Sequence, residues 1–194
     1  MVATSTAVQT NVIDRLVPEW QDSWLKTITL MVVGSVLLAL SSKLQIPMPP
    51  VPFTRQSYVV LVLGMAMGAR LAGMTVLLYL FEGAMGLPVF SSGGGLPYFL
   101  GPTGGYLIGF LIAATAVGYL ADKGMDKNVW RASLAMAVGT ALLFIPGVLW
   151  LAYLFDWQTA LTTGLFPFWF GMIAKLLLGA VTLPLAWQLI GRKR

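Results

Sequence analysis

Six long apolar stretches, separated by short polar or glycine- and proline-rich segments, follow a mixed polar segment at the start of the chain. They occupy residues 24–44, 56–69, 71–87, 104–121, 130–155 and 166–190. A helix over the first stretch is about 31 Å long, which matches a hydrocarbon core of about 30 Å. The second stretch is too short to cross alone, so it either dips beneath a polar loop or has its end shielded by a neighbour. The pattern predicts an all-α membrane protein with six transmembrane helices.

Residues 1–23 lack the basic start, apolar centre and small-residue cleavage site of a signal peptide. Leu16, Trp20 and Trp24 are spaced by four, which places them on one helix face and predicts a short interfacial helix over residues 12–24. We therefore predict that the chain has three parts: a cytoplasmic or interfacial segment (1–23), one transmembrane substrate-binding domain (24–190) and a basic cytoplasmic tail (191–194).

Composition narrows the function classes. The chain is 58% hydrophobic and 10% charged, whereas soluble domains average about 45–50% and about 25%. It contains no Cys and no His, which excludes disulfides, thiolate nucleophiles, Ser-His-Asp triads and histidine metal sites. We therefore expect no catalytic residue, no metal and no cofactor. The glycines at 93–95 are not followed by Gly-Lys-Ser/Thr, so they do not form a nucleotide-binding loop.

The distribution of positive charge predicts the orientation, and nothing indicates nucleic-acid binding. If both termini are cytoplasmic, nine of the twelve Lys and Arg residues lie inside or at the inner interface and three lie in the outer half. The inner set is Arg15, Lys26, Arg70, Lys123, Lys127, Arg131, Arg192, Lys193 and Arg194. The tryptophans fall near the two interfaces, where they would contact membrane lipid. The outer loops therefore become the candidate site.

Both long outer loops have unusual compositions. Residues 47–52 contain four prolines and cannot form a helix, so they predict a stiff, extended segment that is either a wall or lid, or a plain connector. Residues 86–105 include seven Gly and three Pro and carry no charge. Such a loop lets backbone approach a ligand closely. Thr103 is expected to cap the helix that follows.

A lysine at membrane depth is a strong candidate for a binding residue. Lys175 lies about ten residues into the last stretch, where lysine costs about 2.5–3.5 kcal/mol on insertion scales. It either binds a carboxylate or extends to the interface. Trp169 lies on roughly the same helix face, toward the outside.

Polar residues at the predicted outer ends of other stretches each have more than one possible role. Glu82 can accept from a ligand N–H, pair with a cation, or be an interfacial charge. Arg55 can hold a carboxylate or extend to the interface, and Gln56 can read an amide-like group. On the first stretch, Ser35 and Ala39 allow close helix approach, either within the chain or to a partner membrane protein.

Three runs carry a family resemblance. They are IPMPPVPFTRQ at 46–56, EGAMGLPVF at 82–90 and LGPTGGYLIGF at 100–110. In order and spacing the chain resembles the BioY family, the biotin-binding substrate (S) components of energy-coupling-factor transporters, over nearly all of residues 24–190. The resemblance implies an S-component bundle in the cytoplasmic membrane with an outward-opening biotin pocket. It also implies a transmembrane coupling subunit and ATPase subunits as partners, with Ser35 and Ala39 on the docking face.

Biotin requires an apolar pocket, polar groups for its ureido head and a cation for its acid. The residues expected to bind it are Lys175, Gln56, Glu82, Arg55, Tyr106, Trp169 and Phe90, with Tyr98 as a further wall. One position departs from the family: Met172 stands where its sixth helix has an aspartate that would bind the ureido N–H groups. Either Glu82 or Gln56 supplies the acceptor, or binding is weaker, or the ligand differs.

Two other functions remain as alternatives. A self-sufficient secondary transporter for biotin or a related carboxylate could relay protons through Lys175 and Glu82, although the sequence shows no internal repeat. A membrane enzyme acting on lipid would commonly need a carboxylate cluster for metal, and the seven acidic residues form no pair within the membrane.

Overall fold

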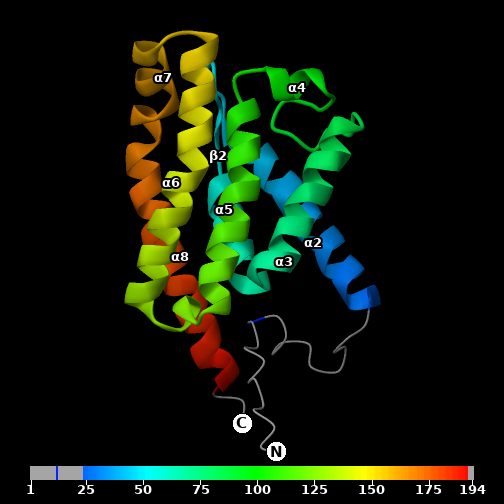
Figure 1. Cartoon of the computed structure of the whole chain (residues 1–194), viewed down its shortest axis with the longest axis vertical. Helices are drawn as coiled ribbons and strands as arrows, with labels where there is room; N and C mark the ends of the chain where they lie inside the picture. The colour runs from blue at the N-terminus through cyan, green and yellow to red at the C-terminus, as the bar shows by residue number, and fades with distance from the viewer. Residues whose placement is uncertain (1–11, 13–23, 192–194) are drawn as a thin grey trace, which may run out of the picture.

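The computed structural model describes residue 12 and residues 24–191 of the chain (Figure 1). Within the last helix it does not describe the side chains of Met172, Lys175, Leu176, Ala180, Leu183, Trp187, Leu189 and Ile190. Most of the predicted interfacial helix (13–23) and the end of the basic tail (192–194) also lie outside the described residues.

Within the part of the chain that the structure describes, five long helical elements form the body of the molecule. They are α2 (Trp24–Lys43), α3 (Gln56–Ala84), α5 (Gly104–Asp122), α6 (Val129–Leu154) and α8 (Trp169–Gly191). The connections contain β1 (Gln45–Ile46), β2 (Phe53–Thr54), α4 (Pro97–Leu100), η2 (Met125–Lys127), α7 (Trp157–Gly164) and η3 (Phe166–Phe168). Among the described residues, α2, α3, α5 and α6 are long and apolar enough to cross a membrane.

Helix α5 lies between α3 and α6, with α2 packed on α3 and α8 packed on α6 (Figure 1). The outer face of α2 is apolar yet exposed, as Val32, Val36 and Leu40 show. Exposed apolar area of this extent is typical of a surface that meets lipid or another membrane protein.

Helix α3 covers two of the predicted stretches, 56–69 and 71–87, and its helical geometry is interrupted between its two parts at Gly68. Gly68 has φ 76° and ψ 171°, a conformation that is essentially restricted to glycine. The break frees the backbone N–H of Ala69, which donates to the Asp122 carboxylate at 3.0 Å. Gly118 of α5 lies directly against Gly68 and Ala69, because a Cβ there would be 2.5 Å from their backbone atoms. The bend is thus held by α5.

The proline-rich segment 47–52 forms no helix, as predicted, and the strands on either side of it, β1 and β2, pair antiparallel with Gln45 opposite Thr54. The other connections differ from the sequence expectations in two ways. The glycine-rich segment contains the short helix α4. Thr103 occupies the cap position of α5 without a side-chain cap bond; its carbonyl accepts from Tyr106 and Leu107 instead.

Helix α7 follows the C-terminal end of α6 and is fixed at both of its ends. At its start the Thr159 hydroxyl and backbone N–H donate to Asp156 at 2.6 and 2.9 Å, which lowers the pKa of that carboxyl. At its end the carbonyl of Gly164 accepts from Tyr106. Figure 1 shows α7 and α4 at one end of the molecule, opposite the start of α2 and the end of α8.

Candidate functional site

A cavity opens at the α4 and α7 end, between α3, α5, α6 and the two unusual loops. The space between its lining atoms is about 520 Å³, including its open mouth. Its lining is largely apolar with several hydroxyl and amide groups. The lining residues are Val51, Pro52, Thr54, Gln56, Ser57, Phe90, Ser91, Tyr98, Thr103, Tyr106, Leu107, Phe110, Leu143, Phe144 and Phe168.

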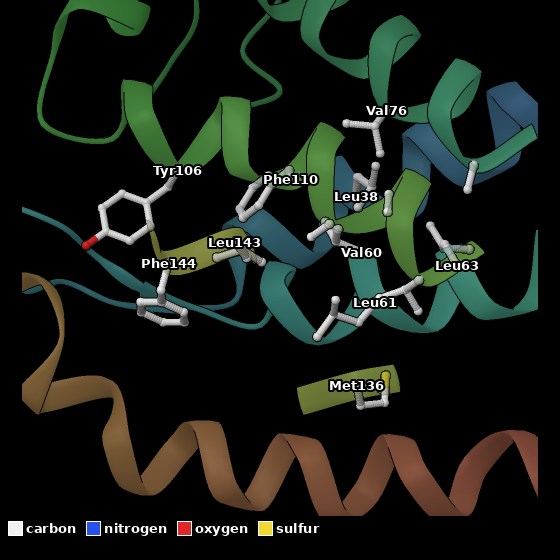
Figure 2. Packing of buried hydrophobic residues seen from close by; sticks show 14 of the residues in the cluster. Leu38, Val60, Leu61, Leu63, Val76, Tyr106, Phe110, Met136, Leu143 and Phe144 are labelled. Carbon is white, nitrogen blue, oxygen red and sulfur yellow. The ribbon is translucent and has the colours of Figure 1, made fainter. Parts of the chain in front are cut away.

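One wall of this cavity is an aromatic layer built by α5, α6 and η3. The rings of Tyr106 and Phe144 meet edge to face at 5.8 Å, and Phe144 meets Phe168 at the same distance. The Tyr106 hydroxyl donates to Gly164 at 2.8 Å, so its ring is fixed in orientation. Figure 2 shows Tyr106 and Phe144 at one end of the buried cluster, with Phe110 beside them. This wall suits the flat or apolar part of a ligand.

Another part of the lining comes from the glycine-rich loop and α4, which supply Phe90, Ser91 and Tyr98. Phe90 is 1% exposed, and its ring packs against Tyr98 at 4.7 Å and edge-on to Tyr79 at 5.4 Å. The hydroxyls of Ser91 and Tyr98 are 2.6 Å apart. Gly83 of α3 makes this packing feasible, because a Cβ there would overlap the Phe90 ring.

Gln56 is the buried amide of the cavity. It is 4% exposed, and its amide nitrogen donates to the Tyr79 hydroxyl at 2.6 Å and to the carbonyl of Leu38 at 3.3 Å. Both N–H groups are therefore engaged within the protein. The amide oxygen is the remaining polar atom of this side chain, and it can accept a hydrogen bond from a ligand N–H.

The segment through β2 separates this cavity from a second hollow. On one side of it Pro52, Thr54 and Gln56 line the cavity. Phe53 and Arg55 instead line a hollow that also includes Lys43. The structure thus places Arg55 on the far side of the wall, where its exposed side chain does not reach the ligand cavity.

Comparison with known proteins identifies the family of this chain and a solved structure with a similar fold. The model of the BioY family matches residues 9–192. The chain belongs to the BioY family. In structure it is similar to the S-component for biotin from an ECF-type ABC transporter, solved at 2.1 Å, with a TM-score of 0.75 and 25% identity over 84% of this chain and 92% of that one.

Curated relatives of the BioY family agree with this assignment. The chain is 36% identical to the biotin transporter BioY of Thermotoga maritima, over 77% of this chain and 88% of that one. It is 35% identical to the biotin transporter BioY2 of Lactococcus lactis, over 81% and 88%. Identity to the probable biotin transporter BioY of Rickettsia prowazekii is 31%, over 81% of both chains.

Three residues expected from the BioY resemblance lie elsewhere in the fold. Glu82 accepts a hydrogen bond from the Ser35 hydroxyl and does not line the cavity. Ser35 is fully buried and Ala39 is partly buried against the core. In the single chain the small residues of α2 therefore face inward, which supports their intramolecular alternative. The apolar side chains beside them face outward.

Of the predicted binding residues in α8, the structure describes only some side chains. Trp169 begins α8, is 50% exposed and does not line the cavity. Lys175 and Met172 lie within α8, but their side chains are outside the described residues. Phe168, just before Trp169, lines the cavity instead.

Several lining residues were not predicted from the sequence. Phe110, Leu143 and Phe144 lie within apolar stretches, where their types are equally typical of core or lipid contact. Ser91 could have been found, because it follows Phe90 in a loop without charges. The positions of the others depend on how α5 and α6 are rotated against each other.

Proposed function

We propose that this BioY-family chain is the S component of a biotin uptake system in a prokaryotic cytoplasmic membrane. It crosses the membrane six times with both termini in the cytoplasm, and the bend at Gly68 separates two of the crossings. It captures biotin on the outer side and takes its energy from a transmembrane coupling subunit and ATPase subunits. The function is transport and not catalysis.

The observation that carries the proposal is the cavity between the aromatic layer and the glycine-rich loop. Biotin has a flat bicyclic ureido head, an apolar tail and a terminal carboxylate. Tyr106 and Phe90 supply aromatic rings to its lining, and the oxygen of Gln56 is an acceptor for a ureido N–H. Of the two acceptors considered from the sequence, Gln56 lines the cavity, whereas Glu82 is bonded to Ser35.

The similar proteins support biotin as the ligand and the subunits of an ECF-type transporter as the partners. Those compared above carry names of biotin transporters, and the solved structure is of an S-component for biotin from an ECF-type ABC transporter. The similarity spans 92% of that solved chain, so the same kind of assembly is proposed here. Lys175 is proposed as the cation for the biotin carboxylate, on the grounds of its depth in the last apolar stretch.

Calorimetric titration of the purified full chain in nanodiscs tests ligand and anchor together. We expect tight binding of biotin, and weakening by about tenfold or more for its methyl ester, because a charge-assisted contact is lost. Lys175→Ala should weaken biotin similarly, and the ester should lose little more in that variant. Lys123→Ala, a cation at the other end of the molecule, is the control and should bind as wild type.

Two outcomes count against the proposal. If folded wild-type protein does not bind biotin, the ligand is a different one and the family name does not predict it. If biotin binds but its ester binds equally well, Lys175 is not the anchor for the acid.

A further inference from the structure

The outer end of α2 holds the backbone of the glycine-rich loop at three consecutive carbonyls. Three side chains from this end of α2 and the start of β1 act as donors, and we refer to them as the α2 clamp. The bonds are Ser42 Oγ to the carbonyl of Val89 at 2.8 Å, Lys43 Nζ to that of Phe90 at 2.6 Å, and Gln45 Nε2 to that of Ser91 at 3.1 Å. Such a row of bonds fixes both the position and the direction of the segment.

The clamped residues are the same ones that form a wall of the cavity. Phe90 and Ser91 line it with their side chains, while their carbonyls point to the α2 clamp. Tyr79 adds a fourth bond, donating to Val89 at 3.2 Å from α3. The backbone of Phe90 and Gly93 is also paired, with N···O distances of 2.9 and 3.4 Å.

The loop needs such support because of its composition. Gly93 and Gly95 adopt positive φ angles of 145° and 97°, and glycine-rich backbone loses more conformational freedom on ordering than other sequences. An ammonium donor makes a stronger hydrogen bond than a neutral one. Lys43 is the charged member of the α2 clamp, so it contributes most to holding Phe90 in place.

We propose that Ser42, Lys43 and Gln45 are positioning residues for ligand binding. They hold Phe90 against the cavity, and their removal lets the wall open and the ligand leave faster. The role of Lys43 is thus to fix the pocket wall from outside it, without contact with the ligand. This inference rests on the proposed function for its ligand, but the ordering of the loop itself can be measured without one.

The first test compares neighbouring serines. Ser41 and Ser42 both donate to a carbonyl three residues back in α2, at 2.8 and 2.7 Å, and only Ser42 also reaches the loop. Ser42→Ala should raise the biotin dissociation rate severalfold, and Ser41→Ala should leave it near the wild-type rate. Lys43→Met should raise it by about tenfold with a small change in association rate. Lys43→Arg keeps a charged donor, so its biotin dissociation rate should be close to that of the wild type.

The second test uses hydrogen exchange of the ligand-free full chain in nanodiscs. Lys43→Met should speed exchange of the amides at 89–95 by about tenfold or more, with exchange in α5 and the thermal midpoint near wild type. Unchanged exchange at 89–95 would overturn the proposal. So would equal dissociation rates for the two serine variants, a comparison that stands even if Lys43→Met fails to fold. Absence of biotin binding in every variant would count against the proposed function alone, because the exchange result does not depend on the ligand.

Discussion

At the scale of single residues, the orientation of the Gln56 amide carries the most specific expectation. Both of its N–H groups donate within the protein, to Tyr79 and Leu38, so its oxygen is assigned to a ureido N–H. Gln56→Leu should weaken biotin binding by about five- to 150-fold, because a buried ligand N–H left without a partner costs about 1–3 kcal/mol. Calorimetric titration of the wild type and the variant measures this difference.

A biotin analogue methylated on the ureido nitrogen separates a direct role of Gln56 from a structural one. The wild type should prefer biotin over this analogue, and Gln56→Leu should lose much of that preference. Tyr79→Phe removes a partner of Gln56 and also the bond to Val89 in the glycine-rich loop, so it should weaken both ligands alike and keep the preference for biotin. An equal loss of affinity for both ligands in Gln56→Leu would show that the side chain only supports the fold.

The sequence predicted residue types at the site better than their directions. Gln56, Phe90 and Tyr106 were predicted as binding residues from their types and the family resemblance, and all three line the cavity. Arg55 could not be placed in this way, since its direction depends on the turn between β2 and α3, where it lines the hollow outside the cavity. The direction of the Glu82 side chain depends on the packing of α2 against α3. This packing brings Ser35, which is 47 positions away in the chain, within hydrogen-bonding distance of Glu82.

At the scale of elements, the bend in α3 depends on a single glycine and a contact from another helix. Gly68→Ala places a side chain at φ 76° and ψ 171°, which costs about 1–3 kcal/mol. We therefore expect a lower thermal midpoint for the purified variant in detergent, followed by tryptophan fluorescence.

Gly73→Ala is the control in the same element. Gly73 lies in the helical part of α3, and the nearest atom to an added Cβ there would be the Thr115 hydroxyl at 3.0 Å. Alanine is also favoured over glycine inside a helix by about 1 kcal/mol. The Gly73 variant should thus lose less stability than the Gly68 variant, and the reverse order would contradict the assigned role of the bend.

The long elements and the break within α3 both follow closely from hydropathy. The first, fourth and fifth stretches were predicted within one residue or so of α2, α5 and α6, because burial in lipid or core needs long apolar runs. The break near residue 70 was predicted as a connection between two separate stretches, and the structure interrupts the helical geometry at Gly68. The hydrogen bond from the Ala69 N–H to Asp122 could not be predicted, because it depends on how α5 packs against α3.

At the scale of the whole molecule, the two ends of the bundle have different chemistry. The end with α4 and α7 holds the cavity and the clamped loop. The opposite end holds η2 and the exposed Lys123, in keeping with the excess of Lys and Arg predicted for the cytoplasmic side. Access to biotin from outside therefore requires one orientation of the chain, and this orientation can be tested independently of binding.

Because the chain contains no Cys, single cysteines report the side of the membrane without background. Gln158→Cys in α7 and Lys123→Cys before η2 both replace exposed residues at opposite ends. A membrane-impermeant maleimide added to intact cells should label the cysteine at 158 and spare the one at 123, which should react only after the membrane is opened. The reverse pattern would place the cavity on the cytoplasmic side and contradict capture from outside. Labelling of both sites in intact cells would mean that the α7 and η2 ends do not lie across the membrane from each other.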